Sequence, residues 1–202
     1  LNGKVFKTPM FMPVATKGAL KSLPFKYLQQ TDFILGNTYH LYLRPGLDVI
    51  KKFNGLHDFI GWSKLILTDS GGFQGWSIPN KFKDDGIEFK NIYDGSKFFM
   101  NPKLSMDIQQ TLNSDIAMIL DSLIDIDSEF DAQLKSIDTT NRWATEAREY
   151  HSNENQSLFG IIQGGRHKEL REKSTTDMIS LDFNGYAIGG LAIGESPEER
   201  KE

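Results

Sequence analysis

Short and almost continuously apolar segments recur along the chain, and longer amphipathic segments separate them. A strand buried on both faces of a parallel sheet has such a run, whereas a strand with one solvated face alternates between apolar and polar residues. The pattern therefore predicts six buried parallel strands, at residues 10–16, 33–37, 65–70, 116–121, 158–164 and 186–190.

Three of the separating segments have apolar side chains at helical spacing. Asn101 can cap a helix whose first turn contains Pro102, and residues 131–150 and 167–181 predict two further helices. Residues 86–99 have an Asp-Gly pair near their middle, which is typical of a tight turn between two antiparallel strands. We therefore predict a β-hairpin inserted at 86–99.

Strands that alternate with helices indicate an α/β fold, and two architectures are compatible with it. A doubly wound sheet that binds a dinucleotide needs a Gly-x-Gly-x-x-Gly turn after its first strand, and this turn is absent. An eight-stranded (β/α) barrel of the TIM type needs about 250 residues, whereas this chain of 202 residues supplies six units. The charged residues 195–202 resemble the start of another helix. We expect residues 1–202 to form one domain, a (β/α)8 barrel truncated to about six units.

The composition excludes several classes of protein. The chain has no cysteine, so it can form neither disulfides nor thiolate metal ligands, and its 4 histidines show no paired spacing. We therefore predict no metal site in this sequence. No apolar stretch approaches the roughly 18 residues of a membrane span. The net charge of −4 argues against a strongly basic nucleic-acid binder, although the basic segment 166–173 could contact phosphates or form a solvated helix face.

Polar residues and glycines follow the predicted strands at the point where each strand ends. The carboxyl ends of parallel strands meet at one edge of a sheet, and this edge carries the active site in barrel enzymes. Some of these residues could instead only cap the turns and helices that follow. In chain order they are Asn37, Asp69, Ser70, Asp121, Gln163, Gly164, Gly165, Gly189 and Gly190.

The acids, amides and N–H groups at such an edge can transfer protons and bind a ring by hydrogen bonds. Two neighbouring acids in a partly apolar pocket acquire different pKa values, so that one can accept hydrogen bonds while the other carries a proton. Carboxylates, amides and backbone N–H groups can together bind a planar heterocycle that has N–H donors and a carbonyl group. Phe73, four residues after Asp69, could stack on such a ring, or it could be an ordinary core residue.

Several motifs occur in the order found in one known family. They are residues 14–18 (VATKG), 36–41 (GNTYHL), 43–46 (LRPG), 67–74 (LTDSGGFQ), 160–165 (GIIQGG) and 185–191 (GYAIGGL). Together they closely resemble the queuine/7-deazaguanine tRNA-guanine transglycosylases, also called tRNA-ribosyltransferases. The similarity extends from about Pro9 to Glu195.

This resemblance implies a catalytic (β/α) barrel and a glycosyl-transfer reaction. Members of the family replace guanine at the first anticodon position of certain tRNAs with queuine or another 7-deazaguanine. An aspartate attacks the anomeric carbon of the ribose, guanine leaves, and the incoming base displaces the enzyme. The implied partners are the tRNA anticodon loop, the bases, and a second subunit in a homodimer or heterodimer. The resemblance also implies a cytoplasmic protein that does not bind membranes.

The resemblance assigns catalytic and stacking roles to four residues. Asp69 resembles the acid/base residue that handles protons on the departing and incoming bases. Asn37 and Ser70 resemble its polar neighbours, and Phe73 occupies the stacking position of the family.

Four further residues resemble the part of the family site that recognises the base. Asp121 resembles the carboxylate that accepts hydrogen bonds from the ring and exocyclic N–H groups. The Gln163 side chain and the Gly190 backbone N–H would hold the ring carbonyl, and the Leu191 backbone would meet the 7-substituent.

The sequence departs from the family pattern in three respects. The nucleophilic aspartate of the family lies beyond the sixth strand, and no part of that motif is present. The resemblance also implies zinc in the full-length protein, bound by three cysteines and a histidine that this chain lacks. Ser122 and Leu123 stand where bacterial members usually have an acid and a cysteine, and residues 75–77 are unusual. The preferred base is therefore left open.

Two functions compete with a transglycosylase. The first is a non-catalytic partner subunit that keeps the barrel and supports tRNA binding. Retention of Asp69, Asp121 and Gln163 together argues against it, because such a subunit has no need of all three. The second is an unrelated barrel enzyme that uses Gly189 and Gly190 near a phosphate, which explains fewer of the motifs.

Overall fold

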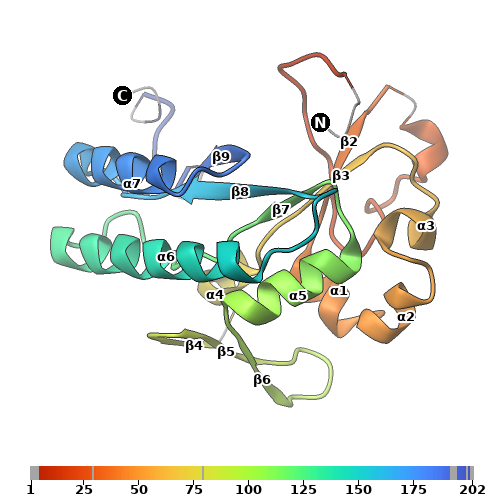
Figure 1. Ribbon diagram of the computed structural model, residues 1–202, viewed down its shortest axis with the longest axis horizontal. Helices are drawn as coiled ribbons and strands as arrows, with labels where there is room; N and C mark the ends of the chain where they lie inside the picture. The colour runs from red at the N-terminus through yellow and green to blue at the C-terminus, as the bar shows by residue number, and fades with distance from the viewer. Residues whose placement is uncertain (1–4, 29, 79, 192–194, 199, 201–202) are drawn as a thin grey trace.

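A six-stranded parallel sheet forms the centre of the molecule, as the computed structural model shows (Figure 1). The structure describes residues 5–28, 30–78, 80–191, 195–198 and 200. Each predicted strand is present, although its bounds are shorter than the apolar run. The strands are β1 (Val14–Ala15), β2 (Phe33–Gly36), β3 (Leu65–Thr68), β7 (Ile116–Met118), β8 (Ser157–Ile162) and β9 (Gly185–Ile188).

The order of the strands distinguishes the two predicted architectures. The sheet runs β1-β2-β3-β7-β8-β9, so neighbours in space follow one another along the chain and every pair is parallel. A doubly wound sheet reverses direction at a switch point, and a barrel does not. The doubly wound alternative is therefore wrong. The prediction of an α/β fold with a parallel sheet is confirmed, but within the described residues the sheet does not close into a barrel.

Three long helices cover one face of the sheet (Figure 1). They are α5 (Pro102–Leu112), α6 (Phe130–Tyr150) and α7 (Lys168–Ser180). The start of α5 agrees with the predicted cap, and the bounds of α6 and α7 lie within one residue of the prediction. The Asn101 side chain caps α5 by accepting a hydrogen bond of 2.9 Å from Leu104 N–H. α5 packs against α6, and α6 packs against α7.

Both faces of the sheet are buried at its central strands β2, β3 and β7, which explains why these strands are continuously apolar. On the face toward the helices, Ile119 of the segment after β7 packs with Met106 and Ala144. On the opposite face, side chains of β2, β3 and β7 form a second cluster, against which Phe6 and Met10 of the N-terminal segment pack. The carboxyl ends of the strands emerge between these two layers.

A small antiparallel sheet projects from the parallel one (Figure 1). Its strands are β4 (Asn80–Lys83), β5 (Gly86–Lys90) and β6 (Lys97–Met100), so the predicted hairpin at 86–99 is confirmed and gains a third strand. The sequence did not indicate β4, because three of its four residues are exposed and it has no apolar alternation. Phe89 anchors this sheet against Tyr39, with ring centroids 5.1 Å apart.

Short helices between β1 and β4 were not predicted, because none is longer than six residues and helical periodicity needs a longer window. They are the 3-10 helix η1 (Phe25–Tyr27) and the helices α1 (Thr38–Leu43), α2 (Leu47–Lys51), α3 (Leu56–Ile60) and α4 (Gly72–Ser77). The helix expected at 195–202 falls partly on residues 199, 201 and 202, which lie outside the described residues. No described helix has both the length and the apolar composition needed to cross a membrane.

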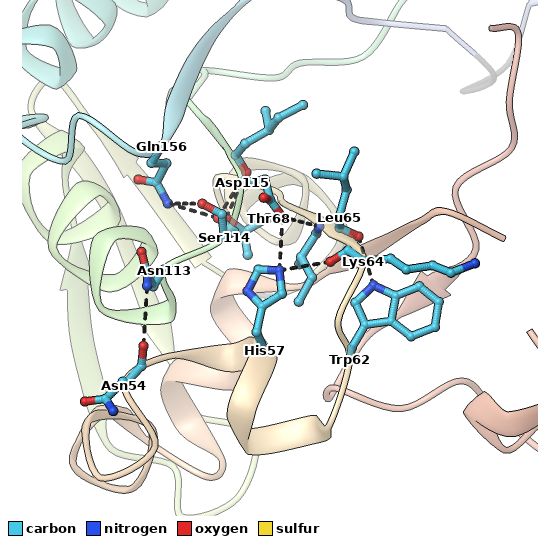
Figure 2. Close-up of polar contacts among 12 residues, drawn as sticks. Asn54, His57, Trp62, Lys64, Leu65, Thr68, Asn113, Ser114, Asp115 and Gln156 are labelled. Atoms are coloured by element: carbon cyan, nitrogen blue, oxygen red, sulfur yellow. Dashed lines mark hydrogen bonds and ion pairs between the residues drawn. The ribbon is translucent and has the colours of Figure 1, made fainter. Parts of the chain in front are cut away.

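A buried polar cluster joins the strands at the amino edge of the sheet (Figure 2). Asp115, just before β7, accepts a hydrogen bond of 2.8 Å from Ile66 N–H and another of 3.0 Å from His57 Nε2. His57 Nε2 also lies 3.0 Å from the Lys64 carbonyl. Because both neighbours of Nε2 are acceptors, this nitrogen carries the ring hydrogen. The cluster therefore fixes α3 and β3 against β7.

We predict that Asp115→Ala lowers the free energy of unfolding by about 2–4 kcal/mol, because it leaves the buried Ile66 N–H without an acceptor. Urea denaturation measures this change. Asp107→Ala is the control, because it removes only an exposed ion pair with Lys103 and should cost less than about 1 kcal/mol. Equal losses in the two variants would contradict the role given to Asp115.

Candidate active site

The register of β2 and β3 places Asn37 beside Asp69. Gly36 is paired with Thr68, so the next residue of each strand leaves the sheet at the same level. Asn37 is the N-cap of α1, and its Oδ1 accepts a hydrogen bond of 3.0 Å from His40 N–H. The cap fixes the orientation of the amide, and Nδ2 therefore donates to Asp69 Oδ2 at 2.5 Å.

The Asp69 carboxylate is held by backbone groups from two turns. Its Oδ1 accepts hydrogen bonds from Thr38 N–H at 2.9 Å and from Gly71 N–H at 3.2 Å. The Thr38 hydroxyl also donates to the Asp69 backbone carbonyl. Gly71 has a φ of 84°, a left-handed conformation that favours glycine. Thr38 was not predicted as a site residue, because its contribution comes from a backbone N–H that any residue carries.

Asp121 forms the second carboxylate of the site, three residues after the end of β7. Its Oδ2 accepts a hydrogen bond of 2.7 Å from Gln163 Nε2, and its Oδ1 accepts one of 3.3 Å from the Ser70 hydroxyl. Asp121, Gln163 and Ser70 are each 5% exposed. A Cβ atom on Gly72 would lie 2.2 Å from Asp121 Oδ1, so only glycine fits beside this carboxylate.

Burial shifts the protonation of both acids. It raises the pKa of the Asp69 carboxyl from 3.8 to about 7, against the opposing effect of the Thr38 and Gly71 hydrogen bonds. The charge of Asp121 contributes to this raised pKa. Burial also raises the pKa of Asp121, opposed by the hydrogen bonds from Gln163 and Ser70. A carboxyl with a pKa near 7 can take up or release a proton at neutral pH, as general acid–base catalysis requires.

The ends of β8 and β9 pack closely against each other beside Asp121. Ile162 is paired with Ile188, so Gln163 and Gly189 follow at the same level. A Cβ atom on Gly189 would lie 2.6 Å from Gln163 Nε2, and one on Gly190 would lie 3.1 Å from Gln163 Oε1. The absence of side chains at both glycines lets the β9 backbone approach the Gln163 amide. Leu191 follows and is 37% exposed.

The remaining predicted residue, Phe73, lies on the first turn of α4 and is 48% exposed. The alternative that Phe73 is an ordinary core residue is therefore wrong. All eight predicted site residues lie at the carboxyl edge of the sheet, and hydrogen bonds join five of them into two groups. Asn37 and Asp69 form one group, and Ser70, Asp121 and Gln163 form the other.

The basic segment 166–173 is solvated for most of its length, which agrees with one of the two predictions made for it, and Arg171 is the exception. Its outer members pair with surface acids, as Arg166 does with Asp127 and Lys173 with Asp138 and Asp177. Arg171 instead turns inward and donates hydrogen bonds to carbonyl groups after β8 and β9. The inward position of Arg171 was not predicted, because helical spacing alone does not place a single arginine toward a neighbouring loop.

The residues of this chain do not fit the zinc site that the resemblance implies. Among the described residues, no three histidine, cysteine, aspartate or glutamate side chains gather closely enough to hold a metal ion. The whole chain also has no cysteine, the ligand that supplies three of the four expected zinc bonds.

The parallel sheet, wound in one direction, defines an α/β protein with a pair of acids at the carboxyl edge of its sheet. A sequence model of the family "Queuine tRNA-ribosyltransferase" matches residues 1–202. Curated relatives with that name from Staphylococcus aureus strains bovine RF122 / ET3-1, JH9 and N315 are each 51% identical over 195 residues. The alignments cover 94% of this chain and 52% of each relative, so the chain spans about half of their length.

The chain belongs to the queuine tRNA-ribosyltransferase family. The resemblance noted from the motifs is thereby confirmed, and the alternative of an unrelated barrel enzyme is wrong. The match also covers every strand that positions the candidate site, from β1 to β9.

The raised pKa of Asp69 predicts a pH dependence of stability. Between pH 4 and pH 7, folded Asp69 keeps a proton that the unfolded chain releases, so the native state loses stability as the pH rises. Asp69→Asn removes this dependence. We expect the free energy of unfolding of the variant, relative to that of the wild type, to increase with pH by at most about 1.4 kcal/mol per pH unit.

Urea denaturation between pH 4 and pH 8 measures the two slopes. Asp58→Asn, a charge removal on α3 far from the carboxyl edge, is the control and should keep the wild-type slope. The same slope in the wild type and in Asp69→Asn would show that Asp69 ionises at an ordinary pKa.

Proposed function

We propose that this chain is part of a tRNA-guanine transglycosylase, which exchanges guanine at the anticodon wobble position for queuine or a 7-deazaguanine precursor in queuosine tRNA modification. The observation that carries the proposal is the pairing of Asp69, with its pKa near 7, and the buried Asp121–Gln163 pair at one edge of the sheet. Membership of the family supports it. A non-catalytic partner subunit is not favoured, because it has no use for a half-buried Asp69 together with the buried Asp121 and Gln163.

The Asp121–Gln163 pair is suited to bind a guanine-like base. Asp121 is acceptor-only when ionised, so it can receive hydrogen bonds from the ring and exocyclic N–H groups of the base. Gln163 Nε2 carries two hydrogens, of which one is bonded to Asp121, and the other can donate to the ring carbonyl. The Gly190 N–H would donate to the same carbonyl. A base without the N–H groups would leave the buried carboxylate unpaired, which gives strong discrimination.

Three neighbouring groups would complete the base site. Phe73, exposed on α4, would stack on the ring. The Leu191 backbone would meet the 7-substituent of the incoming base. Ser70 would keep Asp121 oriented through the hydrogen bond that it donates to Oδ1.

Asp69 would move the proton that base exchange requires. An aspartate outside this chain attacks the ribose anomeric carbon, and the bond from that carbon to guanine breaks. Asp69 in its protonated form donates to the departing base, and its carboxylate then accepts the proton that the incoming base loses. A pKa near 7 allows both directions of transfer at neutral pH. The Asn37, Thr38 and Gly71 donors would stabilise the ionised form between the two steps.

We also propose that the six strands are the N-terminal part of an eight-stranded (β/α) barrel. The edge strands support this, because Val14 of β1 is 54% exposed and Ile188 of β9 is 66% exposed. The nucleophilic aspartate and the zinc ligands would belong to the half of the relatives' length that this chain does not span. The proposed protein acts in the cytoplasm on the tRNA anticodon loop, as a homodimer or with a related subunit.

We predict that Asp121→Asn weakens guanine binding by about 2–4 kcal/mol in the complete gene product, because an amide N–H would then face the N–H donors of the base. Calorimetric titration with guanine measures this loss. Asp107→Asn is a matched control, because it makes the same change from acid to amide at an exposed ion pair with Lys103 on α5. Unchanged guanine affinity in Asp121→Asn would remove Asp121 from the recognition site.

We predict that Asp69→Asn slows the incorporation of labelled guanine into tRNA by roughly 10²–10⁴, the usual contribution of positioned proton transfer. The tRNA should still bind, because phosphate contacts supply most of its affinity. A covalent tRNA adduct should still form slowly, and mass spectrometry should locate it C-terminal to Glu202. Attachment at Asp69 would overturn the assignment. A wild-type protein that exchanges no guanine would overturn the proposed function itself.

A swap of the two side chains separates proton transfer from structure. In Asp69→Asn alone, an amide N–H faces Asn37 Nδ2, which is pinned by its cap on α1. Adding Asn37→Asp restores an acceptor at that contact and keeps the cap, because aspartate also caps helices well. We expect the double variant to regain stability but not activity. Recovery of exchange in the double variant would mean that hydrogen bonding, and not the acid at position 69, limits the rate.

A further inference from the structure

The Arg171 side chain joins the two glycine turns that border the base site. Arg171 lies in the first turns of α7, and its guanidinium points back toward the sheet. Nε donates a hydrogen bond of 3.1 Å to the Gly165 carbonyl after β8. A terminal nitrogen donates one of 2.9 Å to the Gly189 carbonyl after β9. One side chain therefore holds the ends of two neighbouring strands at a fixed separation.

The glycines at these turns leave room for the arginine. A Cβ atom on Gly164 would lie 2.7 Å from Arg171 N, and one on Gly190 would lie 3.3 Å from an Arg171 guanidinium nitrogen. Gly190 has a φ of 67° and Gly165 a φ of 55°, both left-handed. Any side chain added to these turns would displace the guanidinium or strain the backbone. The turns and Arg171 are therefore built as one packed unit.

This unit also contains the amide that binds Asp121. Gly189 and Gly190 both lie against the Gln163 side chain, and Gln163 N–H donates a hydrogen bond of 3.0 Å to the Ser174 hydroxyl, one turn further along α7. The other terminal nitrogen of Arg171 is buried and makes no hydrogen bond within the described residues. Placing a charged group here has a desolvation cost that a purely solvated arginine would not have.

The position of the Gly189–Gly190 turn matters because two N–H donors must form hydrogen bonds with one carbonyl oxygen of the base. Under the proposed function, the Gln163 Nε2 and the Gly190 N–H converge on that oxygen from different strands. Their separation depends on where the Gly189–Gly190 turn stands relative to β8. A guanidinium sets this distance well, because its donors are coplanar and rigid, whereas a lysine ammonium is a single point on a flexible stem.

We propose that Arg171 is a positioning residue that sets the Gly189–Gly190 turn against Gln163 and thereby determines how tightly the site holds its 7-deazaguanine or guanine base. Arg171 does not touch the base itself. The inference rests on the proposed function, and it adds a residue on α7 to a site otherwise made of strand ends.

The test compares Arg171→Gln and Arg171→Lys in the complete gene product, by steady-state exchange of labelled guanine into tRNA. We expect the KM for guanine to rise about tenfold or more in Arg171→Gln, the loss of one or two hydrogen bonds from a charged donor. The KM for tRNA should change less than about twofold, because phosphate contacts dominate that affinity. The KM for guanine of Arg171→Lys, which keeps the charge, should lie between those of the wild type and Arg171→Gln.

Arg148→Gln is a matched control. The Arg148 guanidinium, on α6, also donates to two backbone carbonyls, those of Leu181 and Asp182. These carbonyls follow the C-terminal end of α7, whereas Arg171 lies near its N-terminal end. This variant also loses two hydrogen bonds to backbone carbonyls, and it should leave the KM for guanine unchanged. Should Arg171→Gln fail to fold, Arg171→Lys carries the same comparison.

Each outcome decides the inference. A selective rise in the KM for guanine supports a positioning role. An unchanged KM for guanine overturns it. Equal rises in the KM for guanine and for tRNA also overturn it, as do equal rises in the KM for guanine in the Arg148 and Arg171 variants. A wild-type protein that exchanges no guanine overturns the proposed function and this inference together, whereas an active wild type with an unaffected Arg171→Gln overturns this inference alone.

Discussion

The pairing of parallel strands in a fixed register is the constraint on which the candidate site depends. Because Gly36 lies opposite Thr68, the first residues past β2 and β3 are Asn37 and Asp69, side by side. A slip of one residue would exchange the two faces of a strand and bury the wrong side chains. Both faces of these strands pack against apolar layers, so the register is strongly determined, and the polar contacts at the carboxyl edge follow from it.

The two edges of the sheet use buried carboxylates in opposite ways. At the amino edge, Asp115 accepts hydrogen bonds from Ile66 N–H and His57 and ties three elements together. At the carboxyl edge, Asp69 and Asp121 are held by donors that do not fully offset their burial, and the pKa of each is raised. This division agrees with the general behaviour of parallel α/β proteins, in which the carboxyl edge carries function and the amino edge stability.

The second half of the site depends on close backbone approach instead of on side-chain register. The β9 turn can reach the Gln163 amide only because Gly189 and Gly190 have no Cβ atom. Arg171 occupies the space beside them and bonds to the carbonyls of both turns. Under the proposed function, acid–base chemistry would thus depend on the Asn37 helix cap after β2, and base binding would depend on Arg171 of α7 beside β8 and β9.

The sequence alone determined the parts of this protein that depend on local pattern. Continuous apolar runs predicted the six strands, helical spacing predicted α5, α6 and α7, and ordered motifs predicted the family. Residues at strand ends could be chosen as site residues because all parallel strands end at one edge. The short helices α1 to α4, the strand β4 and the inward turn of Arg171 were decided only by the tertiary structure. The short helices and β4 have little apolar periodicity, so their positions depend on packing against elements distant in sequence. The raised pKa of Asp69 also depends on the tertiary structure, because those elements bury the carboxyl group.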